Sequence, residues 1–165
     1  MMELEDLSEN VGRVLKEKGF LLVTAESCTG GWAAEALTSI PGSSGWYERG
    51  FITYSNLAKR EMLGVNPDVL RAHGAVSTET AKEMALGAIR HSRADVSLAI
   101  TGIAGPGGGS MEKPVGTVCF AWASRDGRVE VAKRRFEGDR RAIRLQAVTE
   151  ALSGLLGFFD PASSS

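Results

Sequence analysis

A serine-rich turn, a tyrosine and a lysine could together form a catalytic group in the first half of the chain. Ser43 and Ser44 lie in the sequence GSS, and Tyr54 and Lys59 follow in TYSNLAK. A serine hydroxyl is a weak nucleophile until a base takes its proton, and lysine is that base only when its amine is kept neutral. Ser-Lys pairs are a known variant of the hydrolase triad, and a phenol can relay a proton between them. From spacing alone, turn-forming serines and a solvated lysine are the simpler interpretation.

The sequence ESCTGG, residues 26–31, is a second candidate. An apolar run at 20–25 precedes it and a helical stretch at 33–38 follows, which predicts a strand, a tight turn and a helix. Hydroxyls and glycine N-H groups at a helix start can bind a phosphate or a carboxamide, although Ser27 or Thr29 could also be an ordinary helix cap. A thiolate would be stabilised at the same place, so Cys28 is a competing nucleophile, unless it is simply buried.

The glycine-rich sequence GIAGPGGGS follows the apolar run at 96–101. It lacks the Gly-Lys-Ser/Thr ending of a phosphate loop, and Ser110 stands where a dinucleotide fingerprint needs its third glycine. Ligands of open α/β sheets collect at such strand ends. The loop therefore either offers backbone N-H groups to an anionic ligand or is a flexible turn.

Positive charge is concentrated near the end of the chain. Arg140 lies in the turn sequence GDR, where a guanidinium could bind a phosphate, and Arg141 is an alternative that the sequence does not separate from it. A solvated basic face is the simpler interpretation of the whole group, and nucleic-acid binding is a third, weaker one. The group consists of Lys133, Arg134, Arg135, Arg140, Arg141 and Arg144. His73 and His91 have no neighbours at metal-ligand spacing, so we expect no metal site.

Composition excludes several classes of protein. The chain has 165 residues, of which 43% are hydrophobic and 24% charged, as in a soluble single-domain protein. A net charge of -1 gives no general attraction to a polyanion. The acidic start and the lack of a long apolar run disfavour export and membrane insertion, and the chain has only two cysteines, so we expect a cytoplasmic protein without disulfides.

Hydrophobic periodicity and turn residues predict alternating helices and strands. We expect helices over 4–18, 33–38, 56–63, a short stretch after Pro67, 78–91 and 142–159, and strands over 20–25, 51–54, 96–101, 115–123 and 129–136. In the helix that ends at Gly64, Ala58, Met62 and Leu63 are expected to face the core, with Lys59 on another face. The predicted fold is α/β, a single three-layer α/β/α sandwich with a mixed sheet over residues 1–160, followed by a flexible tail at 161–165.

Taken together, these motifs resemble the CinA carboxy-terminal domain family, and within it the stand-alone nicotinamide-nucleotide amidohydrolases. The resemblance rests on AESCTGG, GSS, RGFITYSNLAK, HGAVS, TGIAGPGGG, EKPVGTV and GDR, in this order over nearly the whole chain. It implies a hydrolase that converts nicotinamide mononucleotide to nicotinate mononucleotide and ammonia without cofactor or metal. It also implies a homo-oligomer, most simply a dimer.

The resemblance assigns roles to particular residues. It implies that Ser44 is the nucleophile and that Tyr54 and Lys59 activate it. Substrate binding is implied for Ser27, Thr29, Gly30, Gly31, Thr101, Gly102 and Arg140. A nucleotide-binding or regulatory module without catalysis is the alternative function, because the chain has glycine-rich loops and members of the family it resembles are linked to competence and damage responses.

Overall fold

The computed structural model describes residues 3–160, and the statements below refer to these residues. The tail predicted at 161–165 lies outside them. Five strands form one sheet in the order β2-β1-β3-β4-β5. β1 is parallel to both of its neighbours, whereas β4 is antiparallel to β3 and to β5, so the prediction of a mixed sheet is confirmed. The strands are β1 (Leu22–Glu26), β2 (Tyr47–Ile52), β3 (Val96–Gly102), β4 (Thr117–Ser124) and β5 (Val129–Arg135).

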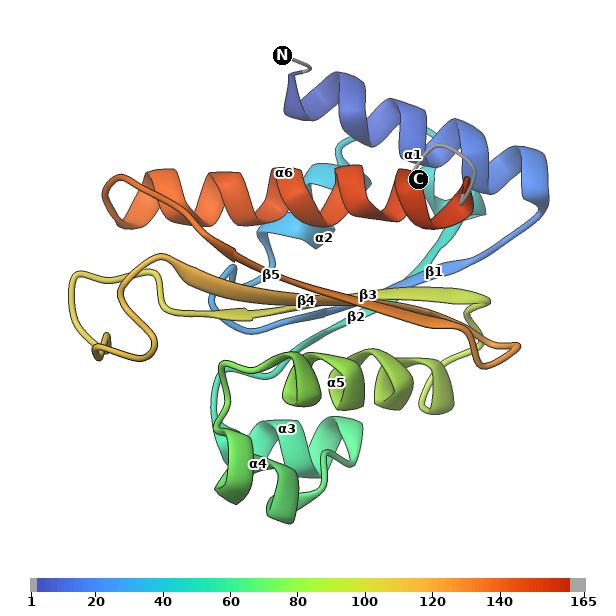
Figure 1. The fold of residues 1–165 in the computed structure, drawn as a ribbon. Coiled ribbons are helices and arrows are strands. Elements are labelled where there is room, and N and C mark those ends of the chain that lie inside the picture. The colour runs from blue at the N-terminus through green and yellow to red at the C-terminus, as the bar shows by residue number, and fades with distance from the viewer. Residues whose placement is uncertain (1–2, 161–165) are drawn as a thin grey trace.

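Helices cover both faces of this sheet, which confirms the three layers (Figure 1). One face carries α1 (Leu4–Lys18), α2 (Trp32–Thr38) and α6 (Arg140–Phe159). The other carries α3 (Asn56–Leu63), α4 (Pro67–His73) and α5 (Thr78–Arg90). A short 3-10 helix, η1 (Ser43–Gly45), connects α2 to β2.

The two cores follow from the alternation of side chains along the strands. Leu98 packs among the residues of α1, α2 and α6, whereas its neighbour Ala99 packs among those of α3, α4 and α5. The central strands are buried on both faces, which explains why β3 reads as a continuous apolar run.

The predicted elements exist, with most ends shifted by one or two residues. The largest difference is β2, which begins at Tyr47, four residues before the predicted strand at 51–54. Its residues are half-buried or exposed because β2 is an edge strand, so its first part, Tyr-Glu-Arg-Gly, lacks the apolar pattern of a core strand.

The expected orientation of α3 is confirmed for Leu63 but wrong for Met62 and Lys59. Met62 is 40% exposed, whereas Lys59 and Leu63, one helical turn apart, are fully buried. The Ser55 side chain caps the helix by accepting a hydrogen bond from the N-H of Ala58, and Gly87 of α5 allows Leu63 to approach closely. Docking of α3 on α5 therefore turns Lys59 toward the interior.

Chain topology opens a crevice at the carboxyl ends of the parallel strands. The connection from β1 to β2 passes over one face through α2, and the connection from β2 to β3 passes over the other through α3, α4 and α5 (Figure 1). The segments that follow these strands therefore diverge, which is the usual place for a ligand in an open α/β sheet.

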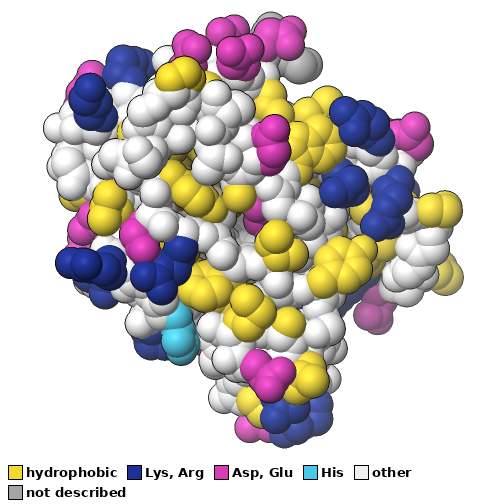
Figure 2. Space-filling model, turned by 180° about the vertical axis from the view of Figure 1, so that it is seen from behind, with side chains coloured by type: hydrophobic (Ala, Val, Ile, Leu, Met, Phe, Trp, Pro, Cys, Tyr) yellow, Lys and Arg dark blue, Asp and Glu magenta, His cyan; other side chains and the backbone are white. Residues whose placement is uncertain are grey.

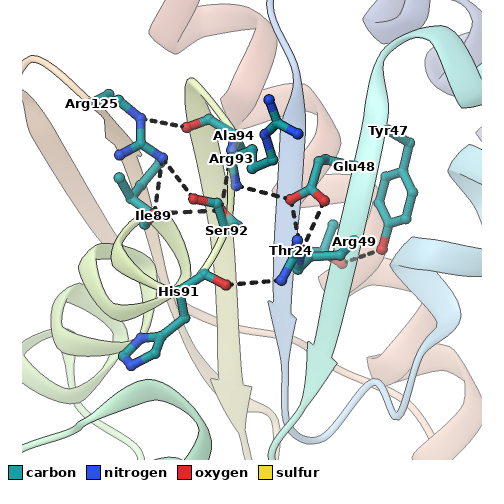
Figure 3. A network of polar contacts seen from close by, with 10 residues as sticks. All are labelled: Thr24, Tyr47, Glu48, Arg49, Ile89, His91, Ser92, Arg93, Ala94 and Arg125. Carbon is teal, nitrogen blue, oxygen red and sulfur yellow. Dashed lines mark hydrogen bonds and ion pairs between the residues drawn. The ribbon is translucent and has the colours of Figure 1, made fainter.

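The opposite end of the sheet carries a network of arginines (Figure 3). Arg125 donates hydrogen bonds to the carbonyls of Ala94, Ile89 and Ser92, at 2.9, 2.9 and 3.1 Å. Arg49 pairs with Glu48 and also donates to the carbonyl of His91 at 3.2 Å. These contacts provide hydrogen bonds to carbonyls at and after the end of α5, where the regular helical hydrogen bonds stop.

Candidate active site at the carboxyl ends of the parallel strands

A cavity of about 280 Å³ lies in the crevice at the carboxyl ends of the strands. Five segments that are distant in sequence line it, one of which is the pair Ala75 and Val76 before α5; the other four carry the candidate residues. They are Ser27 and Cys28 after β1, the segment 54–59 after β2, the segment 101–108 at the end of β3, and Arg140 at the start of α6. The sequence-predicted residues Ser27, Tyr54, Lys59, Thr101, Gly102 and Arg140 are thus brought together.

Ser27 is held in a defined position directly after β1. Its N-H donates to the carbonyl of Ile100 at 3.0 Å, and its carbonyl accepts from the N-H of Gly30 at 3.0 Å. The residue is 8% exposed, and its hydroxyl faces Lys59. Backbone contacts on both sides therefore fix the direction of the hydroxyl.

Lys59 is the most unusual charged group of the site. Only 1% of the residue is exposed, and its Nζ donates to Ser27 Oγ at 3.0 Å and to the carbonyl of Thr53 at 2.8 Å. No carboxylate within residues 3–160 forms an ion pair with it. Burial therefore lowers the pKa of Lys59 from 10.5 to about 8. About a tenth of the amine is neutral at pH 7 and most of it above pH 8, and the neutral form is the one that a general base requires.

Ser44 does not lie with Tyr54 and Lys59. It is an exposed residue of η1, before the start of β2, whereas Tyr54 follows the carboxyl end of that strand. The six residues of β2 span roughly 20 Å. Within the described chain no hydrogen bond joins Ser44 to the cavity, and the role predicted for it as nucleophile has no geometric support in this protein chain.

Cys28 lines the cavity, but its environment disfavours a thiolate. Burial raises the pKa of the thiol to about 11, an effect that outweighs the nearby Arg144. The start of α2 offers no stabilisation, because its N-H groups are occupied by Glu26, whose negative charge raises the pKa of Cys28 further.

Glu26 explains much of the ESCTGG sequence. Its carboxylate is 1% exposed and accepts four hydrogen bonds. The donors are the hydroxyl of Thr29 at 2.6 Å and the N-H groups of Gly31, Ala33 and Ala34 at 3.2, 2.9 and 3.0 Å. The segment that presents Ser27 is therefore folded around a buried carboxylate.

Thr29, Gly30 and Gly31 consequently lie outside the catalytic cavity. They line a different cavity, on the α1, α2 and α6 side of the sheet. Gly30 and Gly31 have φ values of 59° and 106°, a region that favours glycine, so the turn itself requires them. The prediction that these three residues bind the substrate has no geometric support here.

Tyr54 and Arg140 form the mouth of the catalytic cavity. Arg140 donates to Tyr54 Oη at 3.1 Å and to the carbonyl of Gly105 at 2.8 Å. Tyr54 is 62% exposed, and its hydroxyl makes no hydrogen bond to Lys59 or Ser27 in the part of the chain described. The expected relay through Tyr54 is not formed, since Lys59 contacts Ser27 directly.

The glycine-rich loop supplies free donors to the cavity. Gly107 and Gly108 line it, and their N-H groups have no hydrogen-bond partner among residues 3–160. Thr101 has a structural contact, since its hydroxyl donates to the carbonyl of Ala75 at 2.8 Å. Gly102 allows β4 to approach, because a Cβ there would lie 2.8 Å from the side chain of Val118.

Sequence reasoning missed two parts of this site. Asn56, the first residue of α3, lines the cavity, as do Ala75 and Val76 before α5. The HGAVS motif, which contains Ala75 and Val76, is part of the family resemblance, but the resemblance assigns no role to its residues. Asn56 is the first residue of a predicted helix, and nothing in its local sequence indicates that it lines a cavity formed by distant segments.

No metal centre is found in the described part of the chain, where no three His, Cys, Asp or Glu residues are grouped so as to hold an ion. Among the helices of residues 3–160, none has the length and apolar character needed to cross a bilayer.

Fold and site together define an α/β protein with a buried Ser-Lys pair at the carboxyl ends of its parallel strands. A model of the CinA C-terminal domain family matches residues 4–159. The chain belongs to this family, which confirms the resemblance seen in its motifs.

Two similar proteins match over nearly their full length, and a third is longer than this chain. The chain is 54% identical to "Nicotinamide-nucleotide amidohydrolase PncC" of Enterobacter agglomerans, covering 94% of this chain and 95% of that protein. The protein of the same name from Escherichia coli K12 is 55% identical, with 93% of each chain covered. A "CinA-like protein" of Syntrophobacter fumaroxidans is 55% identical over 90% of this chain but only 35% of its own length.

Solved structures have the same fold. The competence/damage inducible protein CihA of Agrobacterium tumefaciens superposes with a TM-score of 0.92 at 48% identity, covering 95% of this chain and 96% of that one. A CinA superfamily protein of Escherichia coli gives 0.91 at 41% identity, covering 94% and 90%.

Proposed function

We propose that this chain is a nicotinamide-nucleotide amidohydrolase, which hydrolyses the carboxamide of nicotinamide mononucleotide to give nicotinate mononucleotide and ammonia. Similarity to two relatives of that name, over more than nine-tenths of each chain, supports the substrate. The observation that carries the chemistry is the contact between the buried amine of Lys59 and the hydroxyl of Ser27.

In the proposed first step, Ser27 is the nucleophile and neutral Lys59 is the base. Lys59 takes the proton of the Ser27 hydroxyl as Oγ attacks the carboxamide carbon, so a C-O bond forms and the carbonyl electrons move to oxygen. Their 3.0 Å separation is within the range needed for proton transfer. The carbonyl of Thr53 accepts a hydrogen bond from Lys59 and so fixes the amine beside the serine.

The tetrahedral intermediate then loses ammonia. Its oxyanion requires N-H donors aimed at the new charge, a role that the free backbone groups of Gly107 and Gly108 suit. Protonated Lys59 returns its proton to the departing nitrogen as the C-N bond breaks, leaving an ester on Ser27. Water, deprotonated by Lys59, attacks this ester, and the C-O bond to Ser27 then breaks as Lys59 returns the proton to Oγ. The acid is released as its carboxylate with loss of a proton to solvent, which regenerates Ser27 and neutral Lys59. The proposed steps use only side chains, backbone donors and water.

Substrate recognition is assigned to the mouth of the cavity. Arg140 offers charged donors to the phosphate, and its contact with Gly105 places the glycine loop beside it. Tyr54 offers an aromatic face to the pyridine ring. Asn56 can exchange hydrogen bonds with the carboxamide, since an amide both donates and accepts.

The test is ammonia release from nicotinamide mononucleotide by protein treated with a chelator. Release at the same rate as before treatment supports the proposal. Calorimetric binding of the mononucleotide without ammonia release would instead favour a binding module. A chelator-sensitive reaction restored by a divalent cation would overturn the metal-independent mechanism.

Cytoplasmic location and a homodimer complete the proposal. Both cysteines are free, as a reducing compartment allows, and Ile52, Tyr54 and Leu57 are exposed near the edge strand β2, where a second copy could pack. Light scattering during gel filtration measures the assembly.

Acidic and basic side chains are intermixed on the face shown in Figure 2, so no single basic surface for nucleic acid is visible there.

A further inference from the structure

The second cavity lies beside the turn 29–31, which follows Ser27 in the chain. It measures about 750 Å³, is open to solvent, and is bordered by α1, the turn 29–31, α2 and the first turns of α6. Its size is within the range of small-molecule sites. We call it the Trp32 cavity, after the aromatic residue at the start of α2 that lines it. None of the steps proposed above uses it.

Two guanidinium groups in this cavity share one aromatic ring. The Cζ atoms of Arg141 and Arg144 lie 4.8 and 5.5 Å from the centre of the Trp32 ring. The arginines are one turn apart on α6, so they are neighbours on the same helix face. Positive charge is thus concentrated at one wall of the cavity.

The two arginines differ in the hydrogen bonds that their guanidinium groups donate. Arg144 donates to the carbonyls of Cys28 and Thr29, both at 3.1 Å, and so supports the turn. Arg141 contacts the Trp32 ring but has no hydrogen bond or ion pair within residues 3–160. Its planar set of donors is available to a ligand.

Within residues 3–160, the acidic side chains that line the cavity do not form ion pairs with Arg141 or Arg144. Glu5 and Glu35 also line it, but both are exposed, and neither forms an ion pair with Arg141 or Arg144 in the described chain. Exposed charges of this kind are screened by solvent and salt. Arg141 is itself exposed, forms no ion pair with either glutamate in the part of the chain described, and lies beside an aromatic ring and an open volume.

We propose that the Trp32 cavity is a second binding site, for a small molecule that carries a phosphate, with Arg141 as its principal contact. Guanidinium groups suit phosphate because their donors match its oxygens in pairs. Adjacent arginines then serve separate cavities, Arg140 the catalytic one and Arg141 the Trp32 cavity. This inference does not depend on the proposed reaction.

The neighbouring arginines provide a matched test. Inorganic phosphate is titrated into isotope-labelled wild-type protein, Arg140→Gln and Arg141→Gln, and the backbone amide signals are followed by NMR. In the wild type we expect shifts at Gly30 and Gly31, which line the Trp32 cavity, and separate shifts at Gly107 and Gly108. Signals far from both cavities report whether each variant is folded.

We expect Arg141→Gln to weaken binding at Gly30 and Gly31 by about tenfold or more, as loss of a charge-assisted contact implies. Arg140→Gln should leave those two signals unchanged, and Arg141→Lys should weaken binding less than Arg141→Gln does, because lysine keeps the charge but not the paired donors. The proposal is overturned if Arg141→Gln binds phosphate there as the wild type does. It is equally overturned if phosphate does not move Gly30 and Gly31 in the wild type.

Discussion

Arg49 and Arg125 at one end of the sheet and Lys59 at the other lie in opposite environments. At the amino end of β1 and β2, Arg49 and Arg125 are exposed to solvent and use their donors on the carbonyls that follow α5 and on Glu48 (Figure 3). At the carboxyl end, Lys59 is buried and has no acidic partner among the described residues. The arginines stabilise the fold, whereas a buried unpaired amine is costly to the fold and useful for proton transfer.

The sharpest way to test this contrast is Lys59→Met, which keeps the length of the side chain and removes the amine. Loss of the base should reduce kcat by about a thousandfold or more. The melting temperature at pH 7 should not fall, because burying a thioether costs less than burying an amine. Steady-state ammonia release and thermal unfolding measure the two effects. A variant that is both active and less stable would refute the contrast.

The same substitution makes a prediction about pH and stability. Because the pKa of Lys59 is about 8 in the folded protein and near 10.5 in the unfolded chain, the unfolded chain binds more protons between these values. Wild-type stability relative to Lys59→Met should therefore rise as pH increases from 8 to 10. Chemical denaturation of both proteins across this range checks the sign.

Glu26→Gln tests whether the buried carboxylate positions the nucleophile. An amide has one oxygen where the carboxylate has two acceptors, so the turn around Ser27 should loosen. We expect kcat to fall about 10- to 100-fold with little change in KM, as a small displacement of a reacting group implies. Glu35→Gln is the matched control and should retain activity, because Glu35 is an exposed residue of α2, the helix whose first N-H groups donate to Glu26. Equal kcat in the two variants would show that Glu26 has no positioning role.

The pH profile should reveal the titration of Lys59 in the wild type. The active form is the neutral amine, so kcat/KM should rise about tenfold from pH 7 to a plateau above pH 9, with a midpoint near 8. A Cys28→Ala variant should give the same profile, because the pKa of that thiol is raised to about 11. A profile with a midpoint near 11 that disappears in Cys28→Ala would indicate the thiol instead.

Arg125→Ala gives the smallest effect on activity and tests the other end of the sheet. Loss of three hydrogen bonds to carbonyls should lower the free energy of unfolding by about 1–2 kcal/mol, with kcat unchanged. The control is Arg93→Ala, whose guanidinium makes no hydrogen bond in residues 3–160. If Arg125→Ala lost activity while remaining stable, the two ends would not be functionally separate.

Local signals in the sequence were sufficient to predict most of the helices and strands. Ser55, Asn66 and Ser77 cap α3, α4 and α5 through their own side chains, and the apolar run at 96–101 became the central strand β3. Such features depend on neighbours a few residues away. The edge strand β2 was predicted too short because half of it faces solvent and lacks an apolar pattern.

The site was less predictable because it depends on contacts between distant residues. Ser27 and Lys59 are 32 positions apart and meet only when β1, β2 and α3 pack together. The rotation of α3, which buries Lys59, is set by its docking on α5. Similarly, residue spacing did not indicate that Gly30 and Gly31 line a different cavity from Ser27. The turn takes this course because it folds around the hydrogen-bonded carboxylate of Glu26.

The central claim is that Ser27, and not Ser44, is the nucleophile that Lys59 activates. The most direct measurement is ammonia release from nicotinamide mononucleotide by wild-type protein, Ser27→Ala and Ser44→Ala, each shown to be folded and to bind the mononucleotide. We predict that Ser27→Ala loses about 10⁴-fold or more in kcat, as removal of a serine nucleophile does, while Ser44→Ala retains wild-type turnover. Turnover that survives in Ser27→Ala and disappears in Ser44→Ala would contradict the account.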